Sequence, residues 1–395
     1  MLEAIVQPWN FAILVALMLL LGQRGVIPVS EFARKLLFLL FQMAVLGWVL
    51  GTWKGIIFYL LYIGLIGWGI RRLGPSRPRS GWWCAAIVAV IVAVLLLAKY
   101  YLPHSVRGAL ALKQVWATIS LSFLTFRLIH VAMDVHAGLI PCPNWLTFLN
   151  YAFFVPVSVA GPIQNYGEFD SQFSNGQVLF EEEFVFAIRR LVFGIAKKVL
   201  IAAPLSPYVL GNMEPAGSHP FLLLMAACLL YSVYIYVDFS GYTDIAIGCA
   251  ALAGVKLPEN FNRPYLATNL QDFWSRWHMT LTAWLRTYLF YPLNKMLVYR
   301  FPGQAKKVDP MIAVIITFAL AGMWHGDGWN FLVFGLMHGV GIAAFLLFRG
   351  KSRATPSPLG VFLSRAGTLI YVSLAWIPFV YPLEEIPWLI HSALH

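Results

Sequence analysis

The sequence predicts an all-α polytopic membrane protein, a bundle of about 10–12 transmembrane or re-entrant helices. Of its 395 residues, 60% are hydrophobic and only 11% are charged, whereas ordinary globular chains carry roughly 25% charged residues. The mean hydropathy is +0.73, and long apolar runs recur along almost the whole chain. A soluble protein could not cover its surface with so few polar groups. We expect one integral membrane domain over residues 1–395, in which residues 1–110 and 350–395 supply flanking spans.

Apolar runs define the expected helices in order, because a bilayer core of about 30 Å needs roughly 20 apolar helical residues. The candidate spans are residues 8–22, 36–50, 55–70, 82–102, 114–133, 145–160, 184–210, 221–238, 279–299, 310–325, 329–348 and 361–380. Pro156 and the Gly161–Pro162 pair interrupt the sixth span, which indicates a broken or re-entrant segment buried within protein. The first run has no basic n-region or cleavage site, so we expect a retained span.

Charge predicts the orientation of these spans. The chain has a formal net charge of +11, and membrane proteins concentrate Lys and Arg in cytoplasmic loops. Two loops are the most basic: Arg71, Arg72, Arg77 and Arg79, then Arg349, Lys351 and Arg353. Placing both in the cytoplasm puts the N-terminus of this multi-pass protein outside. The surplus positive charge is thereby explained without nucleic acid, which we do not expect as a partner.

The span 184–210 is the one apolar run with several charges inside it. It contains Arg189, Arg190, Lys197 and Lys198, each of which costs roughly 2.5–3.5 kcal/mol at a helix centre on insertion scales. We therefore expect a helix at the membrane interface, or one whose long basic side chains reach the interface.

Ionisable groups inside membrane spans are rare and favour a functional role, and three regions concentrate them. In the first, Arg127, His130 and Asp134 follow an i, i+3, i+7 spacing that puts them on one helical face. An internal Arg–Asp or Arg–carbonyl pair that fixes helix packing is the favoured interpretation of this stripe.

The second region runs from Tyr236 to Tyr291 and combines a turn-rich loop at 257–265 with a dense aromatic stretch. Asp238 ends the preceding span, and Trp274, Arg276, Trp277 and His278 follow the loop. An interfacial aromatic belt explains the tryptophans equally well, but it accounts less well for His278.

The third region, 321–339, places His325 at the end of an apolar run, between Trp324 and Gly326, and Asn330 and His338 follow. A buried structural histidine is the competing interpretation for His325.

The absence of several motifs narrows the kinds of catalytic chemistry that the sequence can support. The sequence has no Gly-x-Ser-x-Gly elbow, no phosphate-binding glycine loop and no compact pair of metal-ligating histidines. The four cysteines form no CxxC pair and are expected to be buried hydrophobes. We expect no metal site. One or two buried histidines that can take a proton from a hydroxyl remain.

The second and third regions resemble the membrane-bound O-acyltransferase family. The similar stretches are 237–248, 257–265, 273–285 and 322–326, together with 124–127 and 160–163, in unbroken order over residues 115–345. The motifs 238–242 and 258–262 resemble the bacterial alginate O-acetylation branch most closely. Length and the short C-terminal tail resemble the branch that moves D-alanine onto teichoic acids. Thr287 stands where the alginate-type pattern has Asp, so any role of that aspartate is absent.

The resemblance implies a helical bundle around a central tunnel, with an acyl donor on the cytoplasmic side and an acceptor on the other. It assigns the catalytic role to His325 and functional importance to His278. Our hypothesis is that His325 acts as general base on the acceptor and that His278 orients or polarises the donor carbonyl. Substrate-binding or tunnel positions are expected at Trp274, Arg276, Trp277, Trp324, Asp238 and Asn330.

By the same resemblance, no cofactor is expected beyond the donor, an acyl-CoA or acyl-carrier protein. An SGNH-type or single-span periplasmic partner and a polysaccharide acceptor are expected. Acetyl transfer to an exported polysaccharide is the leading interpretation, with D-alanyl transfer as the alternative. A transporter or flippase, and a non-catalytic scaffold, are alternatives of other classes. Transport predicts interrupted segments repeated in two halves, which we do not find in the sequence.

Overall fold

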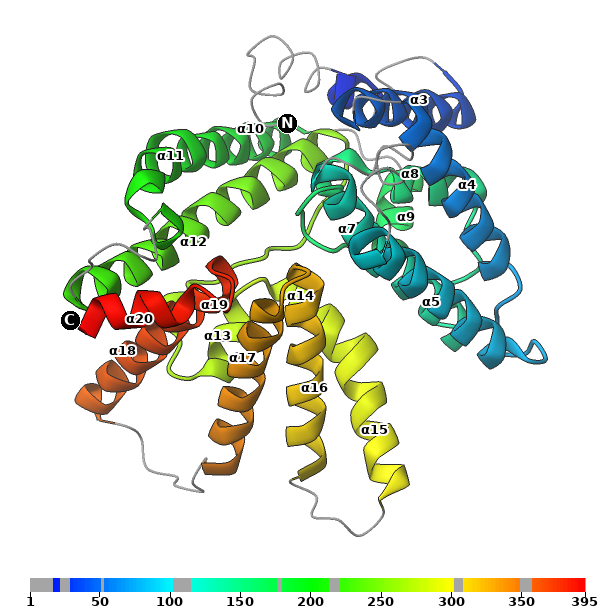
Figure 1. The fold of residues 1–395 in the computed structure, drawn as a ribbon. Helices are drawn as coiled ribbons and strands as arrows, with labels where there is room; N and C mark the ends of the chain where they lie inside the picture. Colours follow the sequence, from blue (N-terminus) through cyan, green and yellow to red (C-terminus); the bar gives the residue numbers. More distant parts are fainter. Residues whose placement is uncertain are drawn as a thin grey trace. The chain divides into compact units, whose positions relative to one another are not determined.

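The computed structural model describes residues 17–21, 29–50, 53–101, 115–175, 180–212, 221–301, 308–348 and 357–394. Every regular element in these ranges is a helix (Figure 1), so the predicted all-α class is confirmed. The chain forms two compact units. Unit 1 comprises residues 1–194 and 242–258, and unit 2 comprises residues 195–241 and 259–395. The predicted span 8–22 lies largely outside the described residues, as do Arg349, Lys351 and Arg353.

Six described helices are long and apolar enough to cross a membrane. These helices span Trp53–Ile70, Ser80–Tyr100, Phe221–Leu252, Val308–His325, Trp329–Phe348 and Pro358–Val380. The chain is therefore a polytopic membrane protein. The predicted spans at 55–70, 310–325 and 329–348 match helices to within two residues. By contrast, the span predicted at 221–238 continues to Leu252, because the polar residues after Val237 stay in the helix.

Unit 1 begins with α3 (Glu31–Leu50), α4 (Trp53–Ile70) and α5 (Ser80–Leu96), which ends in the π-helical turn η1 (Leu97–Tyr101). The long helix α7 (Val115–Ala137) packs against both α4 and α5. At one end of this packing, the Ser80 hydroxyl lies 2.8 Å from Nδ1 of His136. The loops 71–79 and 138–144 therefore lie at the same end of unit 1.

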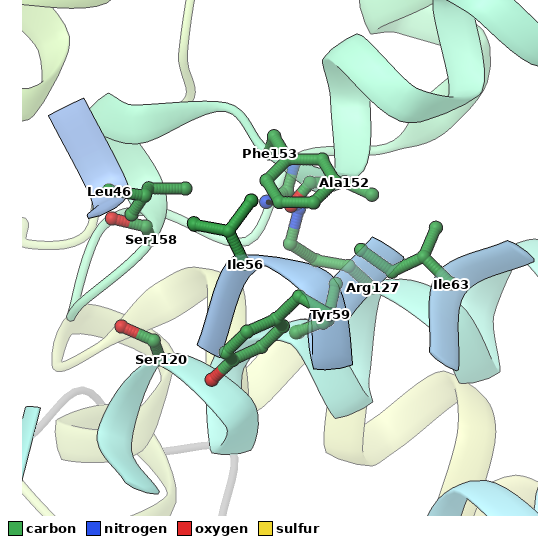
Figure 2. Close-up of a pocket in the computed structure, with 10 residues that line it drawn as sticks. Leu46, Ile56, Tyr59, Ile63, Ser120, Arg127, Ala152, Phe153 and Ser158 are labelled. Atoms are coloured by element: carbon green, nitrogen blue, oxygen red, sulfur yellow. Dashed lines mark hydrogen bonds between the residues drawn. The ribbon is translucent and has the colours of Figure 1, made fainter. Parts of the chain in front are cut away.

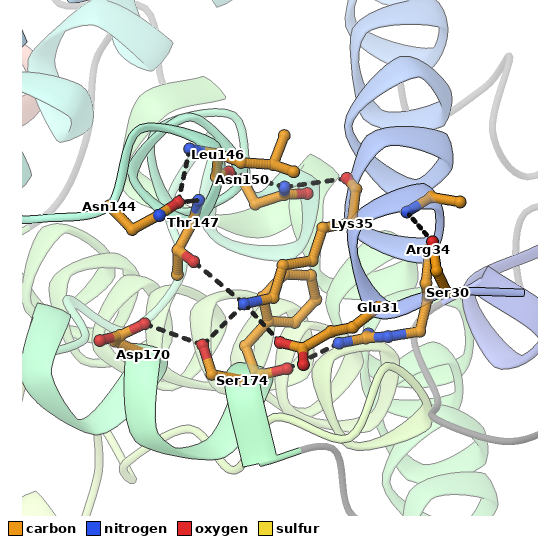
Figure 3. Close-up of polar contacts among 12 residues, drawn as sticks. Ser30, Glu31, Arg34, Lys35, Asn144, Leu146, Thr147, Asn150, Asp170 and Ser174 are labelled. Atoms are coloured by element: carbon orange, nitrogen blue, oxygen red, sulfur yellow. Dashed lines mark hydrogen bonds and ion pairs between the residues drawn. The ribbon is translucent and has the colours of Figure 1, made fainter.

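Polar contacts attach α3 to the short helices α8 (Trp145–Ala152) and α9 (Tyr166–Asn175) (Figure 3). Lys35 Nζ reaches the hydroxyl of Ser174 at 2.8 Å and the carboxylate of Glu31 at 2.8 Å. Arg34 donates to the backbone carbonyl of Phe173 at 2.8 Å. Both basic side chains are buried, and these contacts offset part of the cost of burying their charges.

The predicted break in the sixth span is confirmed. Helix α8 ends at Ala152, and a 3₁₀ turn, η2 (Val155–Val157), follows with Pro156 inside it. Non-helical backbone at this depth requires protein partners for its polar groups. The Gln42 side chain supplies one of them, because its Oε1 accepts a hydrogen bond from the amide of Val155.

The charged run after residue 180 forms α10 (Glu181–Ala196), the π-helical turn η3 (Lys197–Ala202) and short helices to Asn212. Two of its cations are paired with carboxylates of α12 (Phe221–Leu252). Within unit 1, Arg190 lies 2.8 Å from Asp244, and within unit 2, Lys198 pairs with Asp238. These two side chains therefore avoid the cost of insertion through ion pairs, an arrangement that the expectation of an interfacial helix did not include.

Unit 2 contains the remaining helices: α13 (Leu270–Arg276), α14 (Met279–Leu285), the π-helical turn η7 (Arg286–Phe290), α15 (Tyr291–Arg300), α16 (Val308–His325), α17 (Trp329–Phe348), α18 (Pro358–Ala375), α19 (Ile377–Val380) and α20 (Ile386–Leu394). The helices α16 and α17 run side by side as a hairpin (Figure 1). A Cβ at Gly322 would lie 2.2 Å from the carbonyl oxygen of Phe331. The absence of a side chain therefore lets the two backbones touch, a typical packing in membrane helices.

Candidate functional site

His278 lies in the turn between α13 and α14, with φ 42° and ψ 53° in the left-handed region. Such a conformation is uncommon for a residue with a side chain and persists only where its surroundings enforce it. Here the loop before α13 supplies that constraint. The amide of Met279 donates to the carbonyl of Asn260 at 2.9 Å, and the amide of Asn262 donates to the carbonyl of Arg276 at 2.9 Å.

The Asn260 side chain, fully buried, sets the tautomer of His278. Its Oδ1 accepts from the backbone amide of Thr280 at 3.3 Å and from the Thr280 hydroxyl at 2.6 Å. Because the backbone amide can only donate, this atom must be the oxygen. The same Oδ1 lies 3.3 Å from Nδ1 of His278, so Nδ1 carries the proton. Nε2 therefore presents a lone pair, which a general base or a hydrogen-bond acceptor requires.

Burial keeps this imidazole neutral. His278 is 4% exposed, and burial, with a smaller contribution from the charge of His325, lowers the pKa of His278 to about 3. The residue is therefore uncharged at neutral pH. Both histidines belong to unit 2.

His325 is the last residue of α16. The chain breaks there and α17 begins at Trp329. Gly326 is required at the break, because a Cβ would lie 1.8 Å from the ring of Phe331. Aromatic rings surround the imidazole: Trp324 at 4.7 Å, Phe379 at 5.3 Å and Phe334 at 5.9 Å between ring centroids. His325 is half-buried, so it is more accessible than His278.

Aromatic side chains also enclose His278 and the predicted tunnel residue Trp277. The Phe239 ring lies edge-on to His278 at 4.8 Å, and Trp277 packs against Phe261 at 5.0 Å and Trp376 at 5.6 Å. Trp376 in turn stacks on Phe334, which contacts His325. A continuous set of aromatic rings thus joins the two predicted histidines and includes Trp277.

The other expected tunnel residues have definite structural partners. Trp274 donates from Nε1 to Nδ1 of His338 at 3.3 Å, and Asn330 donates to the carbonyl of Pro378 at 2.9 Å. Arg276 pairs with Asp272 at 2.7 Å, one turn earlier in α13. Asp238 pairs with Lys198. Trp274, Asn330 and Asp238 are thus held by other helices and Arg276 by its own helix, and their expected substrate contacts stay predictions.

Sequence reasoning missed two residues that the structure brings to this neighbourhood. Asn260 and Thr280 fix His278, although the motif around Asn260 had already been singled out. His338, 1% exposed, stacks edge-on to Phe334 at 4.8 Å. His338 belongs to the third region of the sequence, and the break after His325 puts it in a separate helix, α17.

The polar stripe of α7 separates into two arrangements within unit 1. His130 Nδ1 lies 3.0 Å from the carboxylate of Asp134, and its Nε2 accepts from the amide of Tyr166 at 2.8 Å. Arg127 instead donates to the carbonyl of Ala152 at 3.3 Å. The expected packing role, through an Arg–carbonyl contact, is thus supported.

The cysteines differ from the expectation at one position, since Cys142 is exposed and the other three are buried.

Two neighbouring imidazoles inside an aromatic enclosure, one with an assigned lone pair, can move a proton away from bulk water. Within the described ranges, no three His, Cys, Asp or Glu side chains are grouped so as to hold a metal ion.

The helices and this site define a membrane protein with a buried histidine centre. The model of the family MBOAT, membrane-bound O-acyltransferase, matches residues 112–358, and the chain belongs to this family.

The names of three relatives refer to peptidoglycan, alginate and teichoic acid. A peptidoglycan O-acetyltransferase of Helicobacter pylori is 36% identical over 242 residues, which cover 59% of this chain and 44% of that protein. A probable alginate O-acetylase, AlgI, of Azotobacter vinelandii is 30% identical over 281 residues, which cover 70% of this chain and 53% of that protein. A teichoic acid D-alanyltransferase of Bacillus subtilis is 29% identical over 285 residues, which cover 69% of this chain and 70% of that protein. The chain thus spans about half the length of the first two relatives.

Proposed function

We propose that this protein is a membrane-embedded O-acyltransferase that moves an acyl group, acetyl in the leading version, from a cytoplasmic donor towards hydroxyls of an exported cell-surface polysaccharide. The observation that supports it most is the pair of neighbouring histidines in an aromatic enclosure, His278 with its Nε2 lone pair and His325 at the end of α16. Membership of an O-acyltransferase family supports the reaction class.

In the proposed reaction, His325 removes the proton of the acceptor hydroxyl as its oxygen attacks the acyl carbonyl. The new C–O bond forms, the bond from the acyl carbon to the donor sulfur breaks, and the leaving thiolate takes the proton back from His325. His278 cannot polarise the donor carbonyl from Nε2 in its neutral form, because that atom has no hydrogen. We assign it instead a hydrogen-bond-accepting role that orients the incoming hydroxyl. Trp277 and Trp324 would exclude water.

The remaining features of this proposal follow the family resemblance. The donor would be an acyl-CoA or an acylated carrier protein in the cytoplasm. An SGNH-type or single-span partner would complete delivery to the polymer outside. The protein would reside in the bacterial inner membrane, with the basic loop 71–79 in the cytoplasm and the N-terminus outside.

D-alanyl transfer to a teichoic-acid-type polymer is the second candidate function. The observation that supports it is the match over 70% of the Bacillus subtilis D-alanyltransferase, although a probable alginate O-acetylase of Pseudomonas aeruginosa is matched over a similar share, 68%. Both candidates use the same proton transfer, so they differ in the acyl group and acceptor and not in the histidine chemistry.

The test is ester content of the cell-surface polymers in a deletion strain that is complemented at matched expression. The complementing genes encode the natural protein, His325→Ala, His278→Ala, or His391→Ala as an exposed control. General-base catalysis contributes roughly 10²–10⁴-fold, so His325→Ala should reduce ester to near the deletion level while His391→Ala restores it. Mass spectrometry of the released acid distinguishes acetate from D-alanine. Full esterification with His325→Ala would instead indicate a scaffold.

A further inference from the structure

A small pocket in unit 1, remote in sequence from the histidine site, surrounds the side chain of Arg127 (Figure 2). Arg127 extends from α7 towards Ala152 and Phe153, at the point where α8 breaks (Figure 2). The lining is largely apolar, with a few hydroxyl groups. The lining residues are Leu46, Ile56, Tyr59, Ile63, Ser120, Leu124, Arg127, Ala152, Phe153 and Ser158.

The guanidinium is held rigidly on two sides. Its Nη1 donates to the carbonyl of Ala152 at 3.3 Å, and its central carbon lies 4.2 Å from the centroid of the Tyr151 ring. Arg127 is 2% exposed. The guanidinium is planar and is fixed through one nitrogen and one face, so its remaining edge is preorganised to bind a ligand.

The remaining edge consists of Nε and Nη2. Both atoms are buried and have no hydrogen-bond partner among the residues that the structure describes. Their N–H bonds point in the same direction, and this is the edge through which arginine binds the two oxygens of a phosphate or carboxylate. Buried donors of this kind are rare without a partner.

The charge of Arg127 is also uncompensated by the nearest acid in its helix. Asp134 is buried and pairs with His130 at 3.0 Å, and none of the ion pairs found within the described ranges includes Arg127. A buried cation needs an anion or a dense set of acceptors. The Ala152 carbonyl supplies one acceptor, and the Tyr151 hydroxyl, which also interacts with the guanidinium, is not an anion.

We propose that this pocket binds an oxyanion, a phosphate or carboxylate, through the Nε/Nη2 edge of Arg127. Two sources share this chemistry: the headgroup of an anionic membrane lipid, and a free anion. The apolar walls from Leu46, Ile56 and Phe153 suit the lipid, and a Ser120 hydroxyl can add a hydrogen bond. The site is separate from the proposed reaction and does not depend on it.

The experiment measures the thermal unfolding midpoint of the full-length protein, purified in an uncharged detergent and stripped of lipid. The added probes are inorganic phosphate, acetate, short-chain phosphatidic acid, and the matching uncharged diacylglycerol. The proteins compared are the natural chain, Arg127→Gln, Arg127→Lys and Ser120→Leu. Arg189→Gln, which changes an exposed arginine of the same unit, is the matched control.

We expect phosphatidic acid to raise the midpoint saturably, whereas diacylglycerol leaves it unchanged. Charge-assisted hydrogen bonds imply a half-saturating concentration roughly 10- to 100-fold higher in Arg127→Gln. Arg127→Lys should also bind more weakly, because it loses the paired donors. A response to phosphate or acetate but not to the lipid supports the site and assigns a soluble anion.

Ser120→Leu keeps the charge and fills the pocket, so it tests the site even if Arg127→Gln does not fold. It should abolish the response to every anion while Arg189→Gln retains it. The proposal is overturned if the natural protein responds to no anionic probe. It is equally overturned if Ser120→Leu, together with whichever Arg127 variant folds, responds as the natural protein does, since the anion would then bind elsewhere.

Discussion

The chemistry of His278 depends on one amide oxygen. Asn260 Oδ1 receives the Thr280 amide and hydroxyl, which fixes the amide orientation and thereby the proton on Nδ1 of His278. The left-handed backbone at His278 costs roughly 1–3 kcal/mol in general, and the hydrogen bonds of the 260–262 segment maintain it. Position and tautomer of the imidazole thus come from a loop that is itself outside the spanning helices.

Because His278 is buried in its neutral form, we predict that acid destabilises the protein partly through this residue. Burial lowers its pKa to about 3 from an ordinary 6.5. Between those values the unfolded chain binds a proton that the folded chain does not, so folding stability rises with pH across this window. Stability contributed by neutral His278 is present above pH 6.5 and is lost as pH falls towards 3.

The measurement for this prediction is the unfolding midpoint in detergent at pH values from 4 to 7. The stability of His278→Gln should depend less steeply on pH than that of the natural protein. The difference in slope should correspond to the uptake of up to one proton per molecule on unfolding. His391→Gln, an exposed histidine variant, should keep the natural slope. Identical slopes in all three proteins would mean that His278 binds protons equally in the folded and unfolded states.

At the scale of helices, the position of His325 depends on the contact between α16 and α17. A Cβ added at Gly322 would lie 2.2 Å from the carbonyl oxygen of Phe331. A Cβ added at Gly335 would lie 2.2 Å from the carbonyl oxygen of Phe318. We predict that Gly322→Ala forces the helices apart and lowers the free energy of unfolding by about 1–3 kcal/mol. Esterification should fall as well, because His325 ends α16, one turn beyond Gly322.

Gly367→Ala in α18 is the matched control, since no atom lies within 4 Å of an added Cβ there. In a helix interior this change should stabilise the protein by about 0.5–1 kcal/mol. Thermal unfolding and ester content are measured on both variants. If Gly322→Ala were as stable as Gly367→Ala, the close approach of α16 and α17 would not govern the site.

The two ion pairs of α12 should differ in strength because their burial differs. The Arg190 and Asp244 side chains are 21% and 8% exposed, whereas the Lys198 and Asp238 side chains are 13% and 39% exposed. Asp244→Asn leaves a largely buried cation and should cost about 3 kcal/mol. Asp238→Asn should cost less than about 1 kcal/mol, because solvent screens that carboxylate.

Thermal unfolding of the two variants checks this order. The double variant Arg190→Gln with Asp244→Asn should recover much of the loss, because removing both charges also removes the buried unpaired one. A larger loss at Asp238 than at Asp244 would contradict the prediction.

Helix class and most boundaries could be predicted from sequence because apolar runs of bilayer length have few alternative conformations. The pairing of Arg190 with Asp244 could not, because the partners are 54 residues apart in sequence (244 − 190) and only the fold brings them together. The same holds for the site. Trp-His-Gly pointed to His325, yet the tautomer of His278 depends on Asn260, 18 residues before it. Residue identity was therefore predictable where a motif is local, and contact geometry was not.

At the scale of the whole molecule, the orientation in the membrane can be tested with a native cysteine. Cys142 is exposed and the other three cysteines are buried. A Cβ at Gly138 would lie 3.0 Å from the Pro75 side chain, so the loop 138–144 lies beside the basic loop 71–79. Positive residues favour the cytoplasmic side, and Cys142 should therefore face the cytoplasm.

In intact cells, a membrane-permeant maleimide should label Cys142 whereas an impermeant one should not, and inverted vesicles should reverse the second result. The opposite end of α4 offers the matched control, Lys54→Cys in a Cys142→Ser background, since α4 runs from Trp53 to Ile70 and Lys54 is exposed. Impermeant reagent should label that position from outside. The opposite labelling pattern at both positions would invert the orientation. It would then place the basic loop 71–79 outside and overturn the proposed location of the N-terminus.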